Sequence, residues 1–138
     1  MRVAVDIGGC ISKYPDQFRM LMITLGVNME MFVITDMHDK AEVMQMLRDN
    51  RFDIPEHHVY CADYAQYGDF CKAKLLQELQ IDFFIDDFLG YVDWDSSFGK
   101  APIRLLVMPD ATQPYWHDSW KVKDESDFGR RKYSVIKE

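Results

Sequence analysis

Three aspartates follow short apolar stretches of this 138-residue chain and together have the chemistry of a metal site. Asp6 ends the stretch RVAV, and the pair Asp86 and Asp87 ends FFI. Carboxylates gathered at one place repel each other, and a divalent cation offsets that repulsion. A site with a few carboxylates and room for water favours magnesium. The structural alternative for any one of them is a loop or turn cap, a role that Asp fills well.

The elements that would position these residues alternate along the chain. The predicted strands are residues 2–7, 31–35, 58–62, 81–85 and 103–108. The predicted helices are residues 15–25, a helix capped by Asp39 that runs to residue 50, and a helix capped by Asp69 with Leu75, Leu76 and Leu79 as its apolar stripe. Such alternation predicts an α/β fold, a three-layer α/β/α sandwich with a mostly parallel, Rossmann-like sheet.

Ligands of such sheets bind outside the carboxyl ends of the strands. This rule brings Asp6, the pair Thr35 and Asp36, and the pair Asp86 and Asp87 to one edge. Lys72 stands at the start of the third helix, from which it can reach that edge. Lys74 is turned about 200° further around the helix axis and is expected to face solvent.

The order Asp, Thr, Lys, Asp-Asp resembles the haloacid dehalogenase (HAD) superfamily. The matching stretches are VAVDIGGCIS, MFVITD and CKAKLLQELQIDFFIDD. The resemblance implies a HAD-like core domain over residues 1–110, and residues 111–138 are predicted to form a C-terminal tail that packs on this core.

The resemblance also implies a role for each matching residue. Asp6 resembles the nucleophile that takes a phosphoryl group to give an aspartyl-phosphate. Thr35 resembles the hydroxyl that hydrogen-bonds a phosphoryl oxygen, and Lys72 the cation that neutralises charge beside the nucleophile. The implied function is a magnesium-dependent phosphohydrolase, whose partner is a phosphorylated substrate of unknown class.

The implied ligands of Mg²⁺ are Asp6, the backbone carbonyl of Gly8, Asp86 and Asp87. Either member of the pair at 86 and 87 can be the direct ligand, with the other behind it.

Gly8 is also where the chain departs from the family, which has a second Asp there as general acid and base. The proton must then come from another group, such as Asp36 or His38. The alternative hypothesis is a non-catalytic HAD-like binding or regulatory module. No cap domain fits between the motifs, which by resemblance implies a large substrate or a cap from a partner chain.

Composition narrows the class of protein further. The formal net charge of −7 disfavours nucleic acid as a partner, because phosphate backbones attract cationic surfaces. We expect no membrane span, since no run of about 18 apolar residues occurs, and no signal peptide. Three cysteines without metal-site spacing suit a reducing compartment, so the expected location is cytoplasmic.

Overall fold

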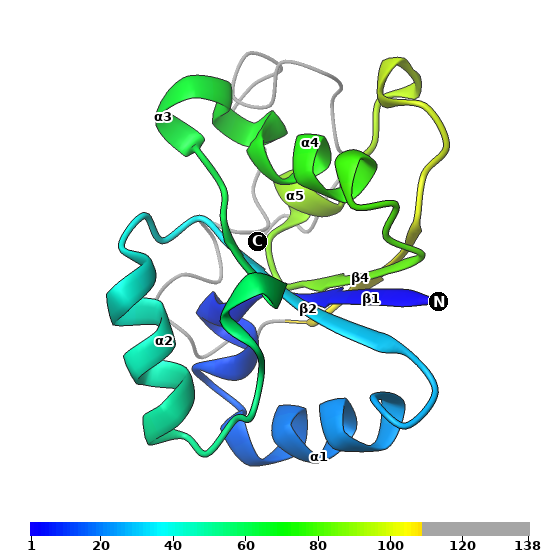
Figure 1. Cartoon of the computed structure of the whole chain (residues 1–138). Coiled ribbons are helices and arrows are strands. Elements are labelled where there is room, and N and C mark those ends of the chain that lie inside the picture. Colours follow the sequence, from blue (N-terminus) through cyan, green and yellow to red (C-terminus); the bar gives the residue numbers. More distant parts are fainter. Residues whose placement is uncertain (109–138) are drawn as a thin grey trace, which may run out of the picture.

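The computed structural model describes residues 1–108, and Figure 1 shows their arrangement. They form a five-stranded, all-parallel sheet in the order β3-β2-β1-β4-β5. The strands are β1 Arg2–Val5, β2 Glu30–Thr35, β3 Val59–Cys61, β4 Phe83–Asp86 and β5 Ile103–Leu106. The predicted α/β fold with a mostly parallel sheet is confirmed, and the sheet is consistent with a Rossmann-like fold. The tail predicted at residues 111–138 lies outside the described residues.

The α-helices of the described part are α1 Pro15–Leu25, α2 Lys40–Asp49, α3 Tyr64–Tyr67, α4 Cys71–Glu78 and α5 Leu89–Val92. The bounds of α1 match the prediction, because Pro15 has the fixed φ that suits a first turn. The predicted cap of α2 is also confirmed, since the Asp39 carboxylate accepts a hydrogen bond from the Glu42 backbone N–H at 3.2 Å. Two short helices, α3 and α5, were not predicted.

The prediction that Asp69 caps the third helix is wrong. Asp69 lies in a 3₁₀ turn, Gly68–Phe70, that runs directly into α4, and the residue at the cap position of α4 is Phe70, which makes no side-chain capping hydrogen bond. The backbone N–H of Cys71 donates to the Gly68 carbonyl instead, so the turn itself satisfies this amide. The chain enters α4 from α3 through this turn, and Asp69 lines the cavity described below instead of capping the helix.

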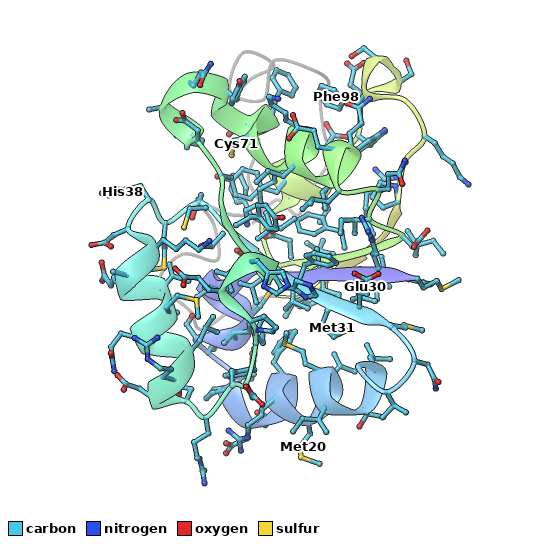
Figure 2. The ribbon with its side chains drawn as sticks, viewed as in Figure 1. Met20, Glu30, Met31, His38, Cys71 and Phe98 are labelled. Carbon is cyan, nitrogen blue, oxygen red and sulfur yellow. The ribbon has the colours of Figure 1, made fainter. Side chains whose placement is uncertain are left out.

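Side chains pack on both faces of the sheet. Figure 1 shows α1 and α2 on one side and α3, α4 and α5 on the other. Successive strand residues point to opposite faces, so Val3, Val5 and Val33 pack with α1 and α2, whereas Ala4, Phe32 and Phe84 pack with α4 and α5. In Figure 2 the labelled Met31 lies between β2 and α1, and Met20 points away from the sheet.

Within residues 1–108, none of the helices combines the length and the apolar character needed to cross a bilayer. The three cysteines are free thiols. Cys10 and Cys71 are buried, and Cys61 is half-buried.

Candidate active site

The order in which the chain adds strands to the sheet reverses at its centre, between β1 and β4. From β1 the chain proceeds outward through β2 to β3, and it then returns to place β4 on the other side of β1. Crevices for ligands open at such switch points, beyond the carboxyl ends of the strands. Asp6 directly follows β1, and Asp86 is the last residue of β4. The topology therefore sets these two aspartates at the point where a ligand is expected.

A buried lysine joins the two aspartates. The Lys72 Nζ, from the first turn of α4, donates to Asp6 Oδ1 at 2.6 Å and to Asp86 Oδ2 at 2.7 Å. Lys72 and Asp86 are fully buried, and Asp6 is 4% exposed. Asp86 Oδ1 accepts a further hydrogen bond, 2.9 Å long, from the Phe88 backbone N–H. Charges removed from water in this way need such close partners, because desolvation is costly.

Lys74, the other lysine of this helix, ion-pairs with Glu78 on the exposed side of α4. Helix geometry thus sends the two lysines in different directions, as their spacing indicates.

Tyr91 of α5 covers the buried ammonium group. Its ring centroid lies 4.4 Å from Lys72 Nζ, a cation–π distance. Its hydroxyl donates to Asp36 Oδ2 at 2.8 Å, which ties the end of β2 to α5. Tyr91 was not predicted as a site residue, and its position five residues after Asp86 is the one sequence signal that could have indicated it.

The site holds more negative than positive charge. Burial, and then the charge of Asp86, raise the pKa of Asp87 from 3.8 to about 6. The same two causes raise the pKa of Asp6 well above its ordinary value, against the opposing effect of Lys72. Burial lowers the pKa of Lys72, but Asp6 and Asp86 outweigh it and raise this pKa, so the lysine stays cationic. Among the described residues of the cavity lining, Lys72 is the one cation beside the carboxylates of Asp6, Asp86 and Asp87, and an added cation would relieve the excess.

The residues present fit a hard cation such as magnesium. One ligand atom each from Asp6, Asp87 and Cys10 lie within 4.8 Å of one another. A hard cation prefers oxygen ligands to sulfur, so the Cys10 thiol is a poor ligand for magnesium. The oxygens that remain are the carboxylates of Asp6 and Asp87. Both oxygens of Asp86 already accept hydrogen bonds, which favours Asp87 as the direct ligand of the pair.

The loop after β1 accommodates these carboxylates through Gly9. Gly9 has φ +73°, and a Cβ there would lie 1.9 Å from Asp87 Oδ2. Gly8 has an ordinary φ of −63°, and within residues 1–108 no atom other than those of its chain neighbours lies within 4 Å of a Cβ built on it. The left-handed, space-limited glycine of this turn is therefore Gly9, and position 8 has room for a side chain.

These residues line one cavity of about 350 Å³. The lining consists of Asp6, Gly8, Asp36, Tyr64, Asp69, Lys72, Asp86, Asp87, Phe88 and Tyr91. Of the predicted site residues, Thr35 alone is not part of this lining. It is fully buried at the end of β2, and its hydroxyl accepts a hydrogen bond from the Met37 backbone N–H at 3.2 Å. Of the two substitute proton donors, Asp36 lines the cavity, whereas His38 lines a neighbouring hollow.

Comparison with known proteins gives no match among family profiles, curated proteins or solved structures. The assignment of function therefore depends on the chemistry of the cavity.

Proposed function

We propose that this chain is a magnesium-dependent phosphohydrolase of the HAD type that acts through an aspartyl-phosphate on Asp6. The observation that carries the proposal is the buried Lys72 ammonium, 2.6 Å from Asp6 and 2.7 Å from Asp86 at the switch point of the sheet. A lysine so placed holds Asp6 in position, and it supplies positive charge where a phosphoryl group would arrive.

The fold supports the same assignment. Helices on both sides of a parallel sheet, as in Figure 1, are what a three-layer α/β/α sandwich of this family requires. The order of the motifs along the chain, Asp6, Thr35, Lys72 and Asp86 with Asp87, agrees with the resemblance. The buried position of Thr35 makes its contact with a phosphoryl oxygen the least supported of the proposed roles.

The proposed reaction has two displacements at phosphorus. A carboxylate oxygen of Asp6 attacks the phosphoryl group, a P–O bond to Asp6 forms, and the P–O bond to the leaving alcohol breaks. Lys72 binds Asp6 Oδ1, and the other oxygen of this carboxylate would be the attacking atom. Water then attacks the same phosphorus, which releases phosphate and restores the Asp6 carboxylate.

Asp6, Asp87 and the carbonyl of Gly8 would hold magnesium, with Asp86 behind them in contact with Lys72. The ion would neutralise charge on the phosphoryl oxygens and orient the group for in-line attack.

The departing alcohol needs a proton, and Gly8 has no side chain to give it. Solvent or Asp36, which lines the same cavity, must supply it. We therefore expect esters with good leaving groups, such as p-nitrophenyl phosphate, to react faster than alkyl phosphates. A non-catalytic module, the second hypothesis, would turn over neither.

Asp6→Asn tests the nucleophile. This nearly isosteric change should abolish magnesium-dependent release of phosphate from p-nitrophenyl phosphate while the circular dichroism spectrum stays unchanged. Asp53→Asn, the same change at an exposed residue outside the cavity, is the matched control and should keep full activity. Turnover that persists in Asp6→Asn would place the chemistry elsewhere, and wild-type protein without any turnover would favour the non-catalytic module.

A further inference from the structure

The Lys72 ammonium group has aromatic neighbours as well as acidic ones. Of its three N–H groups, one donates to Asp6 Oδ1 and one to Asp86 Oδ2. Two ring centroids also lie near Lys72 Nζ, that of Tyr91 at 4.4 Å and that of Phe84 at 5.9 Å. Phe84 is fully buried under the sheet, whereas Tyr91 lines the cavity. Of these two rings, Tyr91 is therefore the one that can separate the ammonium group from the contents of the cavity.

Tyr91 shields this ammonium group from water. Lys72 has no exposed surface and Tyr91 is only 6% exposed, although both residues belong to the lining of the cavity. The face of an aromatic ring attracts a cation, and it does so most strongly where water is excluded. The charge of Lys72 then acts more strongly on the carboxylates beside it, because water does not screen it.

The ring of Tyr91 is itself held at two points. Its hydroxyl donates to Asp36 Oδ2 at 2.8 Å, and its ring packs edge to face with that of Phe88, with centroids 4.9 Å apart and planes at 69°. Asp36 directly follows β2, whereas Tyr91 belongs to α5, a helix of four residues. A single helical turn is not stable alone, so the hydrogen bond to Asp36 fixes the tyrosine to the sheet. A ring locked in this way can hold the ammonium group in one position.

We propose that Tyr91 is a positioning residue that acts through Lys72, and that Asp36 anchors it. The ring keeps the ammonium group dry and directed at Asp6 and Asp86, so Asp6 keeps the orientation from which it attacks phosphorus. This inference rests on the proposed function for its effect on turnover. Loss of the ring should lower kcat and leave KM nearly unchanged, because the contact concerns the nucleophile and not the substrate.

Two substitutions separate the ring from its anchor. Tyr91→Leu removes the ring, whereas Tyr91→Phe keeps the ring and removes the hydrogen bond to Asp36. With p-nitrophenyl phosphate and magnesium, we expect kcat to fall roughly tenfold in Tyr91→Leu and severalfold in Tyr91→Phe. KM should stay within about twofold of the wild-type value in both variants. The leaving group of this ester needs no proton, so a role of Asp36 as proton donor does not enter the comparison.

Asp36→Ala tests the anchor from its other end. This variant should match Tyr91→Phe, and the double variant should lose no more activity than either, since both changes remove the same hydrogen bond. Tyr67→Leu is the matched control. The Tyr67 ring lies 5.3 Å from Nζ of Lys74, a contact of the same kind on the exposed side of α4. Its loss should leave kcat unchanged.

Proton exchange of the Lys72 ammonium group tests the shielding without any turnover. Its ¹H–¹⁵N NMR signal should be visible in the wild-type protein, because buried, hydrogen-bonded protons exchange slowly with water. Exchange should be severalfold faster in Tyr91→Leu, and circular dichroism checks that this variant folds. If it does not fold, Tyr91→Phe and Asp36→Ala decide, since both should also exchange faster than the wild-type protein.

Wild-type kcat and wild-type exchange in a folded Tyr91→Leu variant, or a rise in KM in place of the fall in kcat, would overturn the inference. Additive losses in the double variant would overturn the role of Asp36 as anchor. Neither result would touch the proposed function, which depends on turnover by the wild-type protein. Wild-type protein without turnover would refute the proposed function, and the exchange rates would then decide whether Tyr91 holds Lys72.

Discussion

Replacing Lys72 with methionine should destabilise the fold, because this residue compensates two buried carboxylates. Its ammonium group lies 2.6 Å from Asp6 and 2.7 Å from Asp86, and all three side chains are nearly inaccessible to water. Methionine fills a similar volume without charge, so packing changes little. The main effect is that both carboxylates lose their cation while still buried.

Removing one partner of a buried ion pair costs about 3–5 kcal/mol, and Lys72 serves two partners, so we expect the upper part of that range at pH 8. The loss should be smaller at pH 5. Without the lysine, burial raises the pKa values of Asp6 and Asp86 further in the folded protein. A raised folded-state pKa of an acid gives stability that is present at low pH and lost as the pH rises through it.

Urea unfolding in EDTA at pH 5 and pH 8 measures these free energies. Lys74→Met is the matched control from the same helix, and loss of its exposed ion pair with Glu78 should cost less than about 1 kcal/mol. Adding Asp86→Asn to Lys72→Met should restore part of the stability, because one uncompensated charge disappears. A Lys72→Met variant as stable as Lys74→Met at pH 8 would refute the idea that Lys72 compensates these carboxylates.

Further predictions concern the metal, the pH dependence and the two glycines Gly8 and Gly9. Millimolar magnesium should raise the melting temperature of the wild-type protein, and Asp87→Asn should reduce this shift more than Asp86→Asn; an equal reduction would contradict Asp87 as the direct ligand. In EDTA, the free energy of unfolding should fall as the pH rises from about 4 through 6, because folding raises the pKa of Asp87 to about 6. Urea titrations at several pH values measure this dependence, and it should be weaker in Asp87→Asn. Gly8→Asp should fold normally and raise turnover of alkyl phosphates up to roughly 10²-fold, with little gain on p-nitrophenyl phosphate. Gly9→Ala should instead lower the melting temperature, because the added Cβ would collide with the Asp87 carboxylate.

The sequence was informative where short apolar stretches ended in acidic residues. The stretches before Asp6 and Asp86 could be identified as strands of a parallel sheet, and parallel strands bring their carboxyl ends to one edge. That single rule predicts the meeting of two residues 80 positions apart. Helical geometry likewise distinguishes Lys72 from Lys74, since a 200° rotation cannot leave both facing the sheet.

Several residues in and around the cavity could not be assigned a place or role from the sequence, for reasons of length and of burial. Tyr64 and Tyr91 belong to helices of four residues, and one turn is too short to show an apolar period. Asp69 fits the pattern of a helix cap, and only the preceding turn, which satisfies the first amide of α4, rules that role out. For Thr35, a strand that is apolar on both faces gives no alternation from which to tell which way the hydroxyl points.

The energetic cost of the Lys72 cluster bears on the choice between the two functional hypotheses. Replacing a buried ion pair with apolar residues of similar volume often leaves the stability of a protein unchanged or increases it. A binding module without catalytic activity would therefore gain nothing from the Lys72 cluster. A reaction that develops charge on phosphoryl oxygens does need it, because fixed charges in a site shielded from water act strongly. Under the proposed function, Gly8 gives the site no proton donor at this position but leaves the charges of the Lys72 cluster in place, so the reaction should be slowed at the departure of the alcohol. A site of this composition is expected to be slow with alkyl esters and competent with acidic leaving groups.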